Sequence, residues 1–168
     1  HVAGMVRAVE KAGIRAKLAK SVMDCGEGLP AVWQKSTQEE LDIQEELIKK
    51  FNHTAEDRIQ VWFGIRTIFN ATDELILRSK ELADKYGVGV HMHIAEAKAE
   101  VEYARETRGV TTVTHLNNLG FLDKNVIAAH AVWLTNEEVE MFRKHQVKVS
   151  HNPASAMRVL GFAKIPRM

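Results

Sequence analysis

Segments typical of β-strands alternate with segments typical of α-helices along almost the whole chain. The expected strands are rich in β-branched and aromatic residues, whereas the segments between them carry apolar residues at helical spacing. Strands are predicted over residues 14–23, 58–68, 88–94, 126–134 and 147–151. Because parallel strands need long crossover connections, this order predicts parallel βαβ units, either in a doubly wound sheet or in part of a (β/α)₈ barrel.

The expected helices lie between these strands, and two of them begin with a recognisable cap. Thr37 with Glu40 and Thr135 with Glu138 have the capping-box spacing, which places a hydroxyl and a carboxylate at the first helical turn. Helices are predicted over residues 2–11, 37–51, 71–86, 97–107 and 135–145, with a loop over 24–35, a break over 52–57 and a loop or short helix over 111–122.

The composition favours a soluble globular protein of one domain. The 168 residues are 45% hydrophobic and 27% charged, and 23 basic side chains nearly balance 22 acidic ones. This balance gives no reason to expect a nucleic-acid partner, and the first residues lack the continuous apolar run of a signal peptide or a membrane span. Cys25 is the only cysteine, so no internal disulfide can form, and no base is placed to activate its thiol. We therefore expect a cytoplasmic protein in which Cys25 has no chemical role.

Two histidines and a glutamate gather around the third expected strand, in the stretch GVGVHMHIAE at residues 87–96. Side chains of a strand alternate between its faces, so His91 and His93 share one face and the apolar residues between them share the other. Glu96 follows where the strand should end. This pattern is typical of a metal ligand with a proton-transferring group beside it.

Histidines also lie near the carboxyl ends of the next two expected strands, at His130 and His151. Active sites of (β/α)₈ barrels are built at that end of the strands. A nucleotide-binding doubly wound sheet would carry a glycine-rich turn after its first strand, and the sequence has no G-x-G-x-x-G or P-loop motif. The expected fold is therefore α/β, a partial (β/α)₈ TIM barrel.

These side chains also have purely structural interpretations. A single histidine in an apolar strand is more often a hydrogen-bonded core residue than a ligand, and a glutamate after a strand suits the positive end of the next helix. His91 lies deeper in its strand and is assigned the structural role. Surface positions are predicted for His53, His115 and His145.

The functional interpretation assigns each group a distinct task. Neutral imidazole binds zinc or iron, and a catalytic metal keeps one position for a water whose pKa it lowers toward about 7. Glu96 would take the proton of that water and deliver it to a leaving group, and His130 would orient the attacking oxygen.

Three longer stretches resemble the amidohydrolase superfamily, in its cytosine-deaminase-like branch. They are HMHIAEAKAEVE at 91–102, IAAHAVWLTNEEVEMF at 127–142 and VSHNPASAMRVL at 149–160. This branch includes S-adenosylhomocysteine/5'-methylthioadenosine deaminases, guanine deaminases and s-triazine hydrolases. The resemblance implies that His93 is the metal ligand from the fifth barrel strand, that Glu96 is the proton shuttle and that His130 from the sixth strand orients the water. It places His151 and Asn152 near the substrate at the seventh strand.

Two departures from the family pattern bear on the substrate. Ala156 stands where the H-N-P-x-S motif usually continues with Asn, and the fourth strand ends in Gly64-Ile65-Arg66-Thr67 instead of a turn with a substrate-contacting histidine. Arg66 is therefore a candidate to bind a carboxylate or a ring oxygen of a substrate that differs from the nucleosides.

Part of the family's metal site has no counterpart in these residues. No H-x-H precedes residue 91, and the last aspartate is Asp123, so the ligands of the first and eighth strands are missing. The pair at 91 and 93 does not replace them, because three helix–strand units precede it. Residues 1–168 are therefore expected to be a single partial barrel domain, about strands 3 to 7, without the first two strands, the eighth strand and the family's small β-sandwich.

Three functions are compatible with these sequence features. The first is a metal-dependent aminohydrolase, with zinc or iron, that cleaves C–N or C–Cl bonds of a purine-like or s-triazine-like ring in a longer parent, the 168 residues alone being inactive. The second is a non-catalytic half-barrel whose open sheet edges are covered by self-association; both predict a homo-oligomer. The third is a compact metal-binding module that uses His91, His93, His130 and His151 together.

Overall fold

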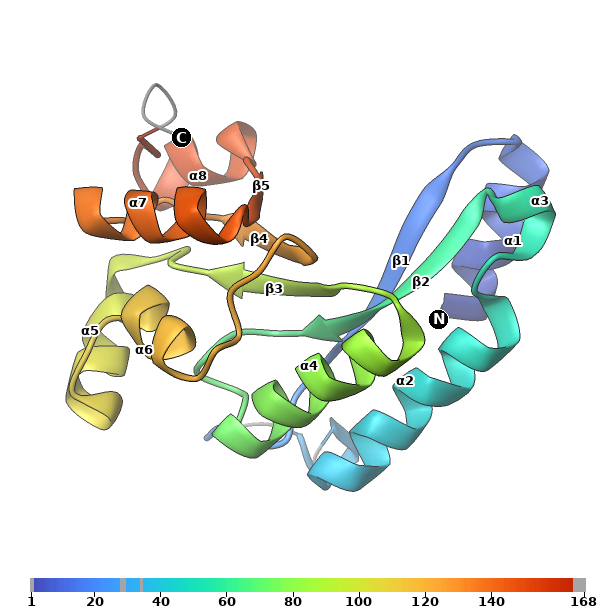
Figure 1. Ribbon diagram of the computed structural model, residues 1–168, viewed down its shortest axis with the longest axis horizontal. Helices are drawn as coiled ribbons and strands as arrows, with labels where there is room; N and C mark the ends of the chain where they lie inside the picture. Colours follow the sequence, from blue (N-terminus) through green and yellow to red (C-terminus); the bar gives the residue numbers. More distant parts are fainter. Residues whose placement is uncertain (1, 28–29, 34, 165–168) are drawn as a thin grey trace.

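A computed structural model describes residues 2–27, 30–33 and 35–164 (Figure 1). The elements, in chain order, are α1 (Val2–Ala12), β1 (Ala16–Val22), the 3₁₀ turn η1 (Ala31–Trp33), α2 (Thr37–Phe51), α3 (Thr54–Asp57), β2 (Ile59–Ile65), α4 (Asp73–Tyr86), β3 (Val90–Ile94), α5 (Lys98–Arg108), α6 (Thr112–Asn118), β4 (Val126–His130), α7 (Asn136–His145), β5 (Lys148–Ser150) and α8 (Pro153–Val159).

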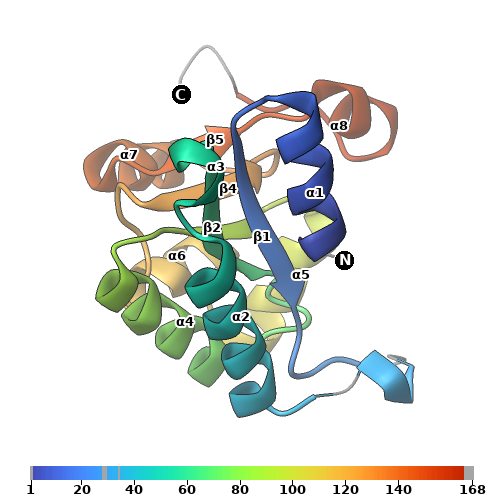
Figure 2. The same ribbon diagram turned by 90° about the vertical axis from the view of Figure 1, so that its right-hand side faces the viewer.

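The strands form one sheet of five, in the order β1-β2-β3-β4-β5, and every neighbouring pair is parallel. Consecutive strands are therefore neighbours in space, and helices connect them, as the alternating pattern predicted. A doubly wound sheet reverses its strand order at a switch point, which this sheet does not do. Figure 1 shows α2 and α4 side by side below the sheet and α7 above β4; Figure 2 shows α1 beside β1.

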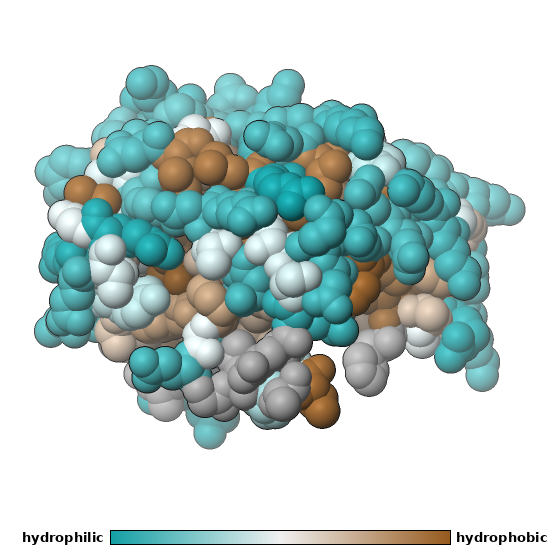
Figure 3. All heavy atoms as spheres, turned by 90° about the horizontal axis from the view of Figure 1, so that it is seen from below, coloured by the Kyte–Doolittle hydropathy of each residue, from teal (hydrophilic) through white to brown (hydrophobic). Residues whose placement is uncertain are grey.

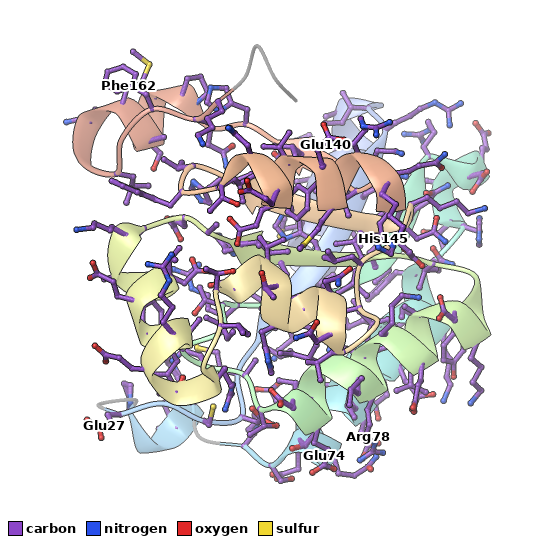
Figure 4. All side chains as sticks on the ribbon, turned by 60° about the vertical axis from the view of Figure 1, so that its left-hand side comes forward. Glu27, Glu74, Arg78, Glu140, His145 and Phe162 are labelled. Carbon is purple, nitrogen blue, oxygen red and sulfur yellow. The ribbon has the colours of Figure 1, made fainter. Side chains whose placement is uncertain are left out.

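The two faces of the sheet have different surroundings. In β3, Val90, Met92 and Ile94 are fully buried, whereas His91 and His93 on the other face are only partly buried. The alternation predicted from the sequence is thus confirmed. The buried face belongs to a continuous apolar core that includes Phe63 and Leu75. The outward sides of the lower helices are mostly hydrophilic, and α4 carries an exposed ion pair between Arg78 and Glu74 (Figures 3 and 4).

Two predicted strands extend too far at their carboxyl ends. β2 ends at Ile65, before Thr67 and Ile68, and β4 ends at His130 instead of residue 134. The reason at β4 is that His130 and Ala131 have φ angles of 75° and 51°, in the left-handed region, so the extended conformation stops there. The predicted break over 52–57 contains the short α3, and the chain after β5 continues as α8, which the sequence pattern did not predict.

The capping box of α2 lies one residue earlier than predicted. Ser36 is the N-cap: its hydroxyl accepts a hydrogen bond from the Glu39 amide, and the Glu39 carboxylate accepts one from the Ser36 amide. The hydroxyl of Thr37 instead donates to Asp24, and Glu40 is buried in an ion pair with Lys20. The prediction of Thr37 with Glu40 was therefore wrong, because tertiary partners occupy both side chains. The second box, Thr135 with Glu138, is confirmed.

No helix in the described ranges combines the length and apolar character needed to cross a bilayer.

A methyl group at Gly89 would collide with two neighbours of β3. A Cβ atom there would lie 2.2 Å from the Asn125 carbonyl oxygen and 2.4 Å from the Trp62 ring. We expect Gly89→Ala to lower the free energy of unfolding by about 1–3 kcal/mol through overpacking, measured by urea denaturation. Gly4→Ala is the control, because only an Arg7 nitrogen lies within 4 Å of that site, at 3.9 Å. It should leave stability unchanged or raise it by up to about 1 kcal/mol. Equal stability of the two variants would contradict the close approach at β3.

Candidate active site

The site begins at the carboxyl end of β3, where the chain leaves the sheet in a tight turn. His93 is the last residue of β3 on the partly exposed face, and Ala95 follows with φ 51°, a left-handed conformation that is uncommon for a residue with a Cβ atom. Because of this turn, Glu96 does not continue the alternation of β3, in which it would share the face of Met92 and Ile94, and it lies beside the end of the strand instead. Non-glycine residues in this region cluster at functional sites, where the surrounding structure holds them.

The carboxyl end of β4 contributes His130 in a second left-handed turn. The register pairs His93 with Ala129 and Ile94 with His130. In a regular strand His130 would therefore lie on the same face as Ile94, under the helices. Its φ of 75° ends that alternation, and the His130 ring stacks on the His93 ring with centroids 5.3 Å apart.

Hydrogen bonds join the two turns directly. The Ala95 carbonyl accepts from the amides of Val132 at 3.0 Å and Trp133 at 2.9 Å, and the Ala131 amide donates to the Ile94 carbonyl at 3.1 Å. The positions of Glu96 and His130 are therefore set by one connected piece of backbone.

His93, Glu96 and His130 form a compact group of possible ligands. One nitrogen or oxygen atom from each lies within 4.8 Å of the other two, and Nε2 of His130 is 3.3 Å from Oε1 of Glu96. The side chain of His130 is 8% exposed and that of Glu96 is 26% exposed. Two imidazoles and a carboxylate are ligand types that zinc binds.

The imidazole nitrogens of this group have unused bonding capacity. Nδ1 of His93 and Nδ1 of His130 are buried and have no hydrogen-bond partner among the described residues. Buried polar atoms normally have a partner, so these nitrogens fit a bound metal or an ordered water. Burial, together with the positive charge of Arg66, lowers the pKa of His93, which keeps its imidazole neutral and able to act as a ligand.

The remaining predicted site residues lie outside this group. Arg66 follows β2 and is exposed, although its charge acts on His93. His151 follows β5 with a buried Nδ1 atom that has no partner in the described parts of the chain, and Asn152 precedes α8 without a side-chain capping bond. His91 contacts His93 edge to face, with ring centroids 5.8 Å apart. The structure thus does not bring His91 and His151 into one ligand group with His93 and His130, which speaks against the compact module.

The other histidines only partly follow the prediction of surface positions. His53 is exposed and pairs with Asp57, and His145 is partly exposed at the end of α7 (Figure 4). The prediction for His115 was wrong: its side chain is 11% exposed and its Nε2 atom lies 2.9 Å from Asp73. The polar neighbours of His115 in the sequence lie on α6, which packs against α5 and α7.

Comparison with known proteins gives the family. The model of the amidohydrolase family matches residues 1–161. This chain belongs to the amidohydrolase family. It is 33% identical to the 5'-deoxyadenosine deaminase of Methanobrevibacter smithii over 95% of its length, and 36% identical to the 5-methylthioadenosine/S-adenosylhomocysteine deaminase of Aquifex aeolicus over 96%. These matches cover 35% and 36% of the relatives, so the chain spans little more than a third of their length.

Solved structures confirm the fold of this amidohydrolase segment. The atrazine chlorohydrolase of Arthrobacter aurescens TC1, crystallised with zinc, matches 99% of this chain with a TM-score of 0.91 and 23% identity. The guanine deaminase of C. acetobutylicum matches 96% with a TM-score of 0.86 and 20% identity. The matches cover 38% and 39% of those chains. The prediction of a partial TIM barrel is therefore confirmed.

The sequence pattern did not single out Glu100, which the structure places against the site of this amidohydrolase. Its carboxylate accepts hydrogen bonds from the amides of Ala95 at 2.8 Å and Glu96 at 2.9 Å. Burial raises the pKa of Glu100 to about 7. One sequence signal was available: Glu100 occupies the same helical face as the apolar Val101 and Ala104, where a charged residue is unusual.

Cys25 lies in the loop after β1 and is half-buried. Burial and the neighbouring negative charge of Asp24 raise the pKa of its thiol above the ordinary value. The thiolate, which is the reactive form, is therefore disfavoured.

We expect Cys25 to react with iodoacetamide at pH 8 at least about threefold more slowly than free cysteine, because less of it is ionised. The rate should still be rising at pH values where free cysteine is already ionised, because burial and Asp24 raise the pKa of this thiol. Mass spectrometry of timed samples measures the rate, and the urea-unfolded chain is the control that should react normally. A folded chain that reacts as fast as the unfolded one would contradict a protected thiol.

Proposed function

We propose that this chain forms the proton-transfer side of the active site of a metal-dependent aminohydrolase, which cleaves a C–N bond of an adenine-like ring by hydrolysis. The observation that supports this best is the approach of His93, Glu96 and His130 at the carboxyl ends of adjacent strands in a member of the amidohydrolase family. Catalytic groups of barrel enzymes come from these strand ends. Residues 1–168 would form one partial barrel domain of such an enzyme.

His93 is the residue best suited to hold a divalent metal, and zinc is the metal that we propose. Its pKa is lowered, so it is neutral at pH 7, and its Nδ1 atom has no partner within the described ranges. When bound, zinc supplies Lewis acidity that allows a water molecule to ionise near neutral pH.

Glu96 and His130 would handle the proton and the attacking oxygen. In the deamination, water adds to the ring carbon, the carboxylate of Glu96 accepts a proton from the water, and it returns the proton to the departing amino nitrogen. The C–N bond then breaks and ammonia leaves, while the second proton of the water passes from the added hydroxyl to the neighbouring ring nitrogen. A ring carbonyl beside an N–H remains, so atoms and protons balance. His130, with Nε2 at 3.3 Å from the Glu96 carboxylate, would donate a hydrogen bond to the developing oxyanion.

Arg66, His151 and Asn152 are proposed to contact the substrate. They follow β2 and β5, the strands next to β3 and β4, at the same end of the sheet as the ligand group. The two curated relatives are named for adenosine derivatives, which favours such a substrate over a chlorinated triazine ring. Exposed Arg66 is suited to a carboxylate or another electron-rich group at the substrate's far end.

A second candidate function rests on the sheet edges. β1 and β5 each pair with a single strand in the described parts of the chain, and an unpaired edge is a template for another strand. A half-barrel that self-associates through these edges, without catalysis, is the alternative. Size-exclusion chromatography with light scattering tests it: a monomer would contradict self-association.

We expect Glu96→Gln to reduce turnover by about 10²–10⁴-fold while the bound metal is retained, because the amide cannot accept the proton. Ammonia release from 5'-deoxyadenosine and 5'-methylthioadenosine measures turnover in a polypeptide that supplies the remaining barrel strands. Glu102→Gln is the matched control, since Glu102 is exposed on α5 and should not affect the rate. Full activity of Glu96→Gln would remove Glu96 from its role.

We expect His93→Ala in the same polypeptide to weaken zinc binding by at least about tenfold, because one imidazole ligand is lost. Titration against a chromophoric chelator measures the affinity, and His53→Ala is the control, because His53 is an exposed residue outside the group. Unchanged affinity of His93→Ala would contradict the ligand assignment.

The 168-residue chain alone should show no turnover after metal addition, and hydrolysis by it would contradict a partial site.

A further inference from the structure

Glu100 is a buried carboxylate that accepts hydrogen bonds from the backbone of the turn that carries Glu96. It lies in the first turn of α5 and is 1% exposed. Both of its oxygens accept from backbone amides, Oε1 from Ala95 and Oε2 from Glu96, at 2.8 and 2.9 Å. A buried carboxylate is unfavourable unless such donors compensate it, so this position for a glutamate indicates a specific task.

The bonds of Glu100 differ from those of an ordinary helix cap. Glu39 and Glu138 are also the third residue of their helices, and each accepts a hydrogen bond from the amide of its own N-cap residue. Glu100 has the same position in α5, but it reaches past the N-cap residue Ala97 to the two residues before it. It therefore holds the turn that contains Glu96 more directly than it holds the helix.

This turn is the one on which the geometry of the site depends. Ala95 has a left-handed φ of 51°, and its carbonyl is bound by the amides of Val132 and Trp133 in the segment after His130. The amide of Ala95 is thus bound by Glu100 and its carbonyl by the segment after β4, so hydrogen bonds fix both backbone groups of this residue. The Glu96 side chain that leaves this turn then lies 3.3 Å from Nε2 of His130.

We propose that Glu100 is a positioning residue, whose carboxylate holds the Ala95–Glu96 turn in the conformation that aims Glu96 at His130. The geometric part of this proposal stands on the contacts above, and its catalytic consequence rests on the proposed function. Two acceptor oxygens are required, because each binds one amide. A glutamine at this position has a single acceptor, and its NH₂ group would face one of the two N–H donors.

The first experiment measures the turn directly in the 168-residue chain. Amide hydrogen exchange, followed by NMR, should be about tenfold or more faster at Ala95, Glu96 or both in Glu100→Gln than in the unchanged chain, because a buried amide loses its acceptor. The proximity of Glu96 to His130, seen as nuclear Overhauser contacts, should be lost in the same variant.

Glu138→Gln is the matched control. Glu138 is buried too, at 3% exposure, and it accepts from the Thr135 amide and the Thr111 hydroxyl. It should unfold at lower urea concentration, as any broken buried bond does, but should leave the amides of Ala95 and Glu96 protected. If Glu100→Gln does not fold, Glu100→Asp keeps both oxygens but withdraws them by one methylene, and it should show the same exchange pattern at smaller amplitude.

The second experiment separates positioning from binding in the polypeptide that supplies the remaining barrel strands. We expect Glu100→Gln to lower kcat at least about tenfold with KM changed by less than twofold, because the groups proposed to contact substrate are not moved. Protected amides in Glu100→Gln, or an unchanged kcat, would overturn the proposal. If the unchanged polypeptide hydrolyses no substrate, the proposed function fails, while the exchange measurement still decides the role of Glu100.

Discussion

The parallel pairing of β3 with β4 is the constraint on which the site depends. It brings the carboxyl ends of the two strands together in a fixed register, with Ile94 opposite His130. Two helices, α5 and α6, separate residues 93 and 96 from residue 130 in the sequence, yet the three residues meet because both strands end at the same level of the sheet. Regular pairing alone would point His130 to the wrong face, however. The left-handed backbone at His130 makes it stack on His93.

The backbone strain at this edge is balanced by hydrogen bonds that the strands themselves do not supply. Left-handed conformations at Ala95, His130 and Ala131 each carry a cost of about 1–3 kcal/mol. The carbonyls of Ile94 and Ala95 accept hydrogen bonds from amides of the segment after His130, and the amides of Ala95 and Glu96 donate to the buried carboxylate of Glu100. These hydrogen bonds hold the two turns in place, and groups that are held in this way can act as preorganised partners of a reaction.

The electrostatic surroundings suit the same chemistry. Burial lowers the pKa of His93 and of His91, so this end of the sheet presents neutral imidazoles instead of cations. Arg66 adds a positive charge without occupying the ligand group, and Glu96 adds the one partly exposed carboxylate of that group. Neutral imidazoles can bind a metal and a neighbouring carboxylate can accept a proton, which are the roles that the proposed function assigns to them.

Local sequence patterns were enough to predict the alternation of strands and helices, the face shared by His91 and His93, and the position of Glu96 just after a strand. These features follow from local periodicity, which a single segment carries in full. The motif resemblance predicted roles for His93, Glu96 and His130, and it predicted the family, which the comparisons confirmed. Tertiary packing sets which hydroxyl caps α2, because the hydroxyl of Thr37 donates a hydrogen bond to Asp24 in the preceding loop. It also sets the largely buried position of His115 beside Asp73 and the stacking of His130 on His93. The hydrogen bonds that Glu100 accepts from the turn before its own helix are a third such contact. Each of these depends on contacts between segments or on a left-handed residue, and neither leaves a periodic signal in the sequence.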